Sequence, residues 1–240
     1  MQLTPASTVG EVAATHPSTI RVFQAHGIDF CCGGGRSLSD VCAAYGVPAA
    51  ALIEELSAAA SAGAGTVPAL ADAPVGEVVR HVLSRYHAWL WRELPRLGGM
   101  ADKVLRVHGE RDAEAVPAMH RLFTALSAEL EPHLVEEEDV VFPALLALEA
   151  RALSGRPAGL ATPLQRVGTG VAALERQHEA VGALLRELRA ACRDFVPPEV
   201  ACNTYRGLLH GLSELEREVH EHVHLENNVL FPAVARLAQA

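Results

Sequence analysis

The sequence lacks the features that mark membrane-spanning and secreted proteins. It has no apolar run of about 18 residues, so we expect no transmembrane helix. Residues 1–10 have neither a basic start nor an apolar stretch, so we expect no secretory signal. The five cysteines are an odd number and two are adjacent, which does not fit a secreted disulfide framework. The predicted location is therefore a reducing cytoplasm.

The sequence also has no excess of basic residues and few aromatic residues. The formal net charge is −9, whereas nucleic acids and anionic membranes bind basic surfaces, so we expect neither as a partner. Only three Tyr, two Trp and six Phe are present, while Ala and Leu dominate and favour helices. Half of the 240 residues are hydrophobic, which is enough for a sizeable core. Together with the abundance of Ala and Leu, this predicts an all-α protein.

Composition divides the chain into three parts. Residues 1–62 predict a small helical domain that contains the glycine-rich segment Asp29-Phe-Cys-Cys-Gly-Gly-Gly35. Residues 63–74 predict a linker, because Ala, Ser, Gly, Pro and Thr dominate there. Residues 75–240 show apolar residues at helical spacing and predict four long helices. These helices are expected over about 74–108, 117–153, 163–194 and 198–238.

One pattern occurs twice in the third part. A histidine is followed four residues later by a glutamate, and five residues after that by Phe-Pro. Side chains four residues apart share a face of a helix, so each copy directs an imidazole and a carboxylate to one point. The copies are His133 and Glu137 before Phe142-Pro143, and His222 and Glu226 before Phe231-Pro232.

A further histidine precedes each copy. His87 lies 46 residues before His133, and His178 lies 44 residues before His222. A helix pair repeated in this way predicts a four-helix up-down bundle with approximate twofold symmetry. Taken singly, each of these histidines is more often an ordinary core residue, and only the repetition of the whole pattern favours a shared site.

The repeated histidines and glutamates predict a two-metal site. Apolar residues flank them at helical offsets, and an unpaired carboxylate buried there would cost several kcal/mol. Bound cations would offset that cost. Two imidazoles and a carboxylate at each metal, with open positions, favour iron or manganese, of which non-haem iron is the usual choice. Structural zinc sites are usually closed and often contain thiolates. The predicted ligands of the di-iron centre are His87, His133, Glu137, His178, His222 and Glu226.

Other polar residues receive weaker interpretations. Glu129, one turn before His133, is a candidate to line the cavity or to hydrogen-bond a ligand. We interpret Glu136, Glu138 and Asp139 as a solvated run of charge. His108 is interpreted as a surface or structural residue, and His224 is expected to point away from the face that carries His222.

The cysteines form a separate signal. Cys31 and Cys32 are candidates for a thiol relay, as exposed thiolates on a mobile loop that bind iron, exchange with a disulfide or react with nitric oxide. The alternative is a glycine-rich turn with incidental thiols. Cys42, Cys192 and Cys202 lie in helical patterns and are expected to be packed.

These motifs resemble a known family. The four-helix part is similar to a hemerythrin-like domain. Asp29-Phe-Cys-Cys-Gly-Gly34, Arg85-Tyr-His87 and the final His222-to-Pro232 run resemble the Repair of Iron Centres family. The resemblance implies a di-iron protein made under nitrosative or oxidative stress that repairs iron–sulfur clusters. It implies damaged iron–sulfur proteins as partners, nitric oxide or oxygen as a small ligand and, at family level, a homodimer through the N-terminal domain.

The sequence departs from the family pattern at two positions, and two alternative functions stay open. Gln177 precedes His178 where relatives can carry an acid, and Pro132 precedes His133 inside a helix, where we expect a kink or a π-like turn. One alternative function is a stand-alone nitric oxide reductase or peroxidase, so enzymatic nitric oxide reduction stays undecided. The other is a non-enzymatic sensor of oxygen, nitric oxide or redox state.

Overall fold

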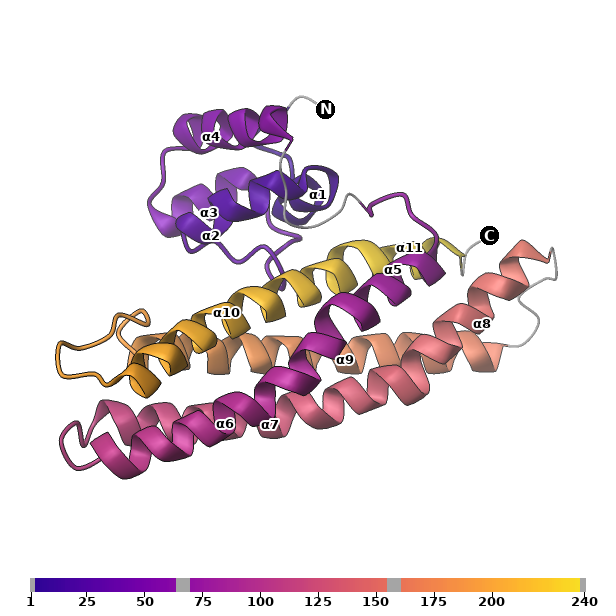
Figure 1. Ribbon diagram of the computed structural model, residues 1–240. Coiled ribbons are helices and arrows are strands. Elements are labelled where there is room, and N and C mark those ends of the chain that lie inside the picture. Colours follow the sequence, from indigo (N-terminus) through magenta and orange to yellow (C-terminus); the bar gives the residue numbers. More distant parts are fainter. Residues whose placement is uncertain (1–2, 64–69, 155–160, 238–240) are drawn as a thin grey trace. The chain divides into compact units, whose positions relative to one another are not determined.

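The computed structural model is built from helices (Figure 1) and describes residues 3–63, 70–154 and 161–237, with no strand within those ranges. The chain folds into two compact units. The first unit is Met1–Val79, Leu145–Gly159 and His220–Ala240, and the second is Arg80–Ala144 and Leu160–Val219. The predicted division into 1–62, 63–74 and 75–240 stays a prediction, and half of its linker, residues 64–69, lies outside the described residues.

The second unit is built from long helices that bury leucine-rich faces, as the helical periodicity predicts. Leu97, Leu126 and Leu212 are completely buried, and a side chain on Gly211 would collide with Leu97, so glycine permits close packing there. This arrangement confirms the all-α class and the helical bundle. The helices are α6 (Ala88–His108), α7 (Ala115–Glu136), α9 (Ala161–Ala191) and most of α10 (Asn203–Leu225).

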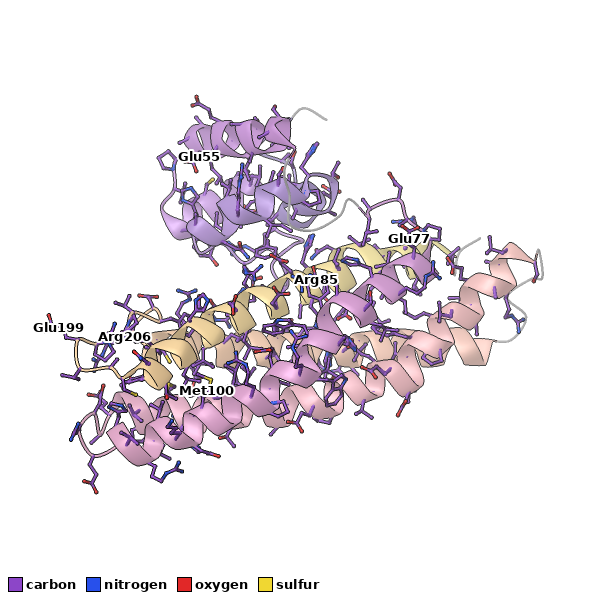
Figure 2. All side chains as sticks on the ribbon, in the orientation of Figure 1. Glu55, Glu77, Arg85, Met100, Glu199 and Arg206 are labelled. Atoms are coloured by element: carbon purple, nitrogen blue, oxygen red, sulfur yellow. The ribbon has the colours of Figure 1, made fainter. Side chains whose placement is uncertain are left out.

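Two buried carboxylates on α10 fix this helix within the second unit. Glu216 is 6 % exposed and accepts hydrogen bonds from the guanidinium of Arg189 on α9, including one of 2.9 Å from Nε. Glu218 is 2 % exposed and pairs with Arg85, labelled in Figure 2, at 2.6 Å. Buried carboxylates need such partners, since leaving one unpaired is strongly destabilising.

The start of the fourth predicted helix is wrong by about five residues. The sequence places it at Pro198, but α10 begins at Asn203. Arg193, Asp194 and Phe195 all adopt left-handed backbone conformations, and they are followed by a turn in which Ala201 N–H donates to Pro198 O. The guanidinium of Arg206 donates to the carbonyls of Ala201 and Glu199, which holds this loop in place (Figure 2).

The first, second and fourth predicted long helices are interrupted by π-helical turns. The first consists of α5 (Val75–Val82), the π turn Leu83–His87 and then α6. The second consists of α7, the π turn Glu137–Val141 and α8 (Phe142–Leu153). The fourth ends with the π turn Glu226–Leu230 and α11 (Phe231–Leu237).

The repeated Phe-Pro explains two of these turns. The amide of Phe142 donates to the carbonyl of Glu137, and that of Phe231 to Glu226, five residues back in each case. The following proline lacks an N–H, and its ring clashes with the carbonyl four residues earlier, so the α-helical ladder cannot continue unchanged. Of the kink or π-like turn expected at Pro132, the structure shows no π turn there, because Pro132 lies within α7 and the π turn begins at Glu137.

The N-terminal part of the first unit, residues 3–63, contains four α-helices and the glycine-rich segment between the second and third. Thr8 caps the first helix through a capping box with Glu11, and Ser37 accepts a hydrogen bond from Asp40 N–H to cap the third, both as capping chemistry predicts. The core includes Ile20, Phe23, Leu52 and Leu56. The helices are α1 (Val9–Thr15), α2 (Ile20–Ala25), α3 (Leu38–Tyr45) and α4 (Ala49–Ala62).

Leu126→Ala should lower the free energy of unfolding by about 2–5 kcal/mol, because a fully buried leucine is replaced by a cavity. Leu153→Ala is the matched control: Leu153 is 82 % exposed, so the change should stay within about 0.5 kcal/mol. Denaturant unfolding measures both, and equal losses would contradict the assignment of Leu126 to the core.

Candidate metal centre

Three histidines converge on one carboxylate in the second unit. His87 Nε2 and His133 Nε2 each lie 3.3 Å from Glu137 Oε2, and His178 Nε2 lies 4.0 Å from Oε1. The Nε2 atoms of His133 and His178 are 3.3 Å apart. All four side chains are at most 2 % exposed. The structure therefore brings four of the six predicted ligands to one buried point.

The π turns position two of these residues. His87 is the last residue of the turn Leu83–His87, and Glu137 is the first of the turn Glu137–Val141. Glu137 N–H donates to the carbonyls of both His133 and Leu134, where the helix changes its hydrogen-bond pattern. A π turn adds a residue to one helical turn and so shifts the faces of the residues after it, a feature that is frequent at functional sites.

A carboxylate outside the cluster orients His87. Glu138 Oε1 lies 2.9 Å from His87 Nδ1 and also accepts a 2.9 Å hydrogen bond from Trp91 Nε1. A hydrogen bond at Nδ1 fixes the ring orientation and leaves Nε2 directed at Glu137. The interpretation of Glu138 as part of a solvated run is therefore wrong, because packing brings it to His87.

The side-chain amide of Gln177 orients His133 in the same way. Gln177 Oε1 lies 2.7 Å from His133 Nδ1, and Gln177 Nε2 donates to Glu136 Oε2 at 3.2 Å. Glu136 is thus also part of a hydrogen-bonded chain and not only a solvated charge. Gln177 is uncharged, and its side-chain oxygen accepts from the imidazole of His133.

The first unit holds the remaining predicted ligands. His222 Nε2 lies 2.9 Å from Glu226 Oε1, and both side chains are completely buried. Glu226 is the first residue of its π turn, as Glu137 is of the other. The exposed position of Glu129 on α7 gives no support to its predicted role, which stays a prediction.

Asp29 organises the two adjacent cysteines in the first unit. Its Oδ1 accepts from the backbone amides of Cys31, Cys32 and Gly33 at 3.2, 2.9 and 3.0 Å, and lies 3.3 Å from Cys31 Sγ. Burial by itself would raise the pKa of Asp29, but these hydrogen bonds outweigh it and the pKa is lowered. The ligand atoms of Asp29, Cys31 and Cys32 lie within 4.8 Å of one another.

The expected exposure of both thiols is wrong for Cys31. Cys31 is 5 % exposed, and its Sγ lies 3.9 Å from that of Cys32. The hydrogen bond with Cys32, burial and the nearby negative charge of Asp29 all raise the pKa of Cys31 well above its usual value. Cys31 is therefore a protonated thiol at neutral pH until a cation or a conformational change alters its surroundings.

The residues next to Glu226 anchor this cysteine segment. Asn228 Nδ2 donates to the carbonyl of Cys31 at 3.0 Å, and Asn227 Nδ2 donates to it at 3.4 Å. His224 Nδ1 lies 3.3 Å from Phe30 O, and burial lowers the pKa of His224 to about 4. Sequence reasoning missed this role. The signal was the Asn-Asn pair, which is a poor choice for a helix interior unless the side chains have specific partners.

Comparison with known proteins places the chain in a family. Residues 78–234 match the family model described as the hemerythrin HHE cation binding domain, and residues 5–60 match ScdA_N, a domain of unknown function. The chain is 32 % identical over 233 residues to the iron–sulfur cluster repair protein YtfE of Yersinia pseudotuberculosis, covering 95 % of this chain and 96 % of the relative. The chain belongs to the Repair of Iron Centres family.

A second relative extends the similarity beyond one genus. The iron–sulfur cluster repair protein YtfE of Pectobacterium carotovorum is 32 % identical over 232 residues, with the same coverage of 95 % and 96 %. The resemblance inferred from the motifs is thereby confirmed for nearly the whole chain. Among the described residues, no helix is long and apolar enough to cross a membrane.

The donors suit the di-iron centre of a hemerythrin-type domain. Imidazole nitrogens and carboxylate oxygens are typical ligands of non-haem iron, and a buried carboxylate facing several imidazoles is stabilised by cations. His87, His133, Glu137 and His178 meet this requirement in the second unit, and His222 with Glu226 offers one more imidazole and one more buried carboxylate in the first.

Glu138→Ala should weaken iron binding by about tenfold to a hundredfold, because His87 loses the partner that orients its ring. Asp139→Asn is the control, since Asp139 is exposed on the same π turn. Competition for ferrous iron with a chelator measures the affinity. Equal affinities in the two variants would contradict the orienting role.

Proposed function

We propose that this protein repairs iron–sulfur clusters damaged by nitrosative or oxidative stress, and that it works in the cytoplasm. The observation that carries the proposal is the convergence of three buried imidazoles on Glu137, in a chain similar along its length to proteins named for iron–sulfur cluster repair. The proposed iron ligands are His87, His133, Glu137, His178, His222 and Glu226.

The repeated pattern supports the inclusion of the last two ligands. His222 and Glu226 stand four residues apart and are both buried, as His133 and Glu137 are in the second unit. His222 Nε2 lies 2.9 Å from Glu226 Oε1. Glu137 and Glu226 are the two carboxylates that would hold the ions.

When bound, the di-iron centre would supply one-electron redox chemistry and a store of transferable iron. The protein's own groups prepare the site. Glu138 and Gln177 hold the Nδ1 atoms of His87 and His133, which leaves the Nε2 lone pairs directed inwards. Complete burial of Glu137 excludes water from the carboxylate and strengthens its interaction with cations.

The adjacent cysteines are proposed to relay iron or nitric oxide between the centre and a client protein. Asn228 binds the carbonyl of Cys31 and lies two residues after Glu226, which links the cysteine segment to the turn that carries a proposed ligand. Asp29, Cys31 and Cys32 offer three donors close enough to hold one ion briefly. Burial of Cys31 keeps this thiol from indiscriminate oxidation.

The proposed partners follow from this role. They are iron–sulfur proteins with damaged clusters as clients and nitric oxide or oxygen as a small ligand at the di-iron centre. A homodimer through the N-terminal domain is the proposed assembly. Whether iron is donated or nitric oxide is reduced is an outcome of the experiments below.

Glu137→Ala and His178→Ala should each reduce bound iron well below the expected ratio of about two ions per chain, because each removes a buried donor. His210→Ala is the control, since His210 is strongly exposed. Metal analysis with Mössbauer spectroscopy measures the ratio and the coupling of the ions. A full complement of coupled iron in both ligand variants would overturn the proposed ligand set.

The Cys31→Ser/Cys32→Ser double variant should keep its iron but lose most of its ability to reactivate a client enzyme with a damaged [4Fe–4S] cluster. The thiols are proposed to transfer iron and not to bind the resident pair. Cys42→Ser serves as the control. Undiminished repair by the double variant would refute the relay, and nitric oxide turnover without repair by the wild type would favour a stand-alone reductase.

A further inference from the structure

A second thiol environment lies in the second unit, far along the chain from the cysteine pair. Cys202 is exposed, so the expectation that it is packed in a helix is wrong. It directly precedes α10, and its carbonyl accepts the hydrogen bond of Arg206 N–H at 3.0 Å. Cys202 therefore occupies the N-cap of a 23-residue helix, where free backbone amides stabilise negative charge.

A buried imidazole faces this thiol. His108, the last residue of α6, is 5 % exposed, and its Nε2 lies 3.2 Å from Cys202 Sγ. The His108 ring also packs against the ring of Tyr205 at 5.4 Å, which fixes its orientation. A cysteine paired with a histidine at a helix start is the environment in which thiolates form most readily.

The surroundings make Cys202 acidic for a thiol. A hydrogen bond from the backbone of Tyr205, another with His108 and a third from the backbone of Thr204 lower the pKa of Cys202 to about 7. The charged or titratable groups around it are His108 and Lys103 from α6 and Tyr205 and Arg206 from α10. Arg206 is bound to loop carbonyls, so its charge is held near the helix start.

The thiol borders a cavity of about 330 Å³. This volume is at the lower end of the range for small-molecule sites. Val104 and Val107 supply an apolar wall, and Lys103, on the same helix, also lines the cavity. Such a cavity suits a small molecule with a short aliphatic stem and a carboxylate. Its lining is completed by Cys202, Asn203 and Thr204.

We propose that Cys202 is a site of thiol–disulfide exchange with a low-molecular-weight disulfide that carries carboxylates. The Cys202 thiolate attacks one sulfur of the disulfide, a new S–S bond forms to Cys202 and the original S–S bond breaks. The other half leaves as a thiolate and takes a proton from water, so the small disulfide is the oxidant and no further reagent is needed. The carboxylate of the attached half pairs with Lys103, and its stem covers Val104 and Val107.

Two buried thiols are less suited to this reaction. Burial raises the pKa of Cys192 to about 12 and also raises that of Cys42. At pH 7 a thiol of pKa about 7 is about half ionised, against about 3 % for an ordinary cysteine. A thiolate of lower pKa is intrinsically less nucleophilic, which cancels part of this gain. The expected reaction rate is then about three times that of an ordinary cysteine. Cys32, which is partly exposed, is the thiol that the experiment must separate from Cys202.

To test this proposal, the full chain is incubated with oxidised glutathione. Adducts are then detected by intact mass and located by peptide mapping. One glutathionyl group on Cys202 is expected in the wild type and in the Cys31→Ser/Cys32→Ser variant, and none at this position in Cys202→Ser. Serine is a favoured N-cap residue, so this variant should keep the helix intact. An adduct that maps to Cys32 and persists unchanged in Cys202→Ser overturns the proposal.

Two further variants test the assigned neighbours. His108→Gln should move the midpoint of the pH–rate profile at Cys202 upwards from about 7, because the thiolate loses one of its partners. Lys103→Ala should slow the reaction with oxidised glutathione several-fold but leave that with uncharged dithiodipyridine unchanged. An unmoved midpoint would remove His108 from the site, and equal slowing of both reagents would overturn recognition of the carboxylate.

Discussion

The structure depends on the burial of one carboxylate among imidazoles. Glu137 is completely buried, and His87, His133 and His178 surround it from three different helical segments. A charge in this position is costly unless cations or protonated partners stabilise it. The packing of the second unit is thus tied to the chemistry of its site, because the helices must approach closely enough for all these groups to meet.

The π turns show how a helix can be adapted to hold ligands without being broken. Both glutamates of the repeated pattern begin such a turn, and both turns end directly before Phe-Pro. Proline has no ligand atom to offer, but it prevents the regular hydrogen-bond ladder from continuing. Its place in the pattern is therefore explained by backbone geometry, whereas the places of histidine and glutamate are explained by chemistry.

The cysteines illustrate how the environment separates residues of the same type. Cys31 is buried beside Asp29, which disfavours its thiolate, whereas Cys202 is exposed beside His108 and helix amides, which favour its thiolate. The first suits a controlled exchange with a bound ion or client. The second suits direct reaction with a small molecule. Reactivity is thus set by charge and solvent access around each sulfur atom.

The sequence by itself determined the all-α class, the histidine–glutamate pairs and the family, because these rest on local periodicity, four-residue spacing and short motifs. Tertiary structure decided the contacts between residues that are distant in the sequence. Glu138 hydrogen-bonds His87 across 51 residues, and the side chains that anchor Cys31 come from nearly 200 residues away. Likewise, the left-handed residues Arg193–Phe195 and the turn after them delay α10 and expose Cys202. Such outcomes depend on how distant segments pack, which no local pattern records.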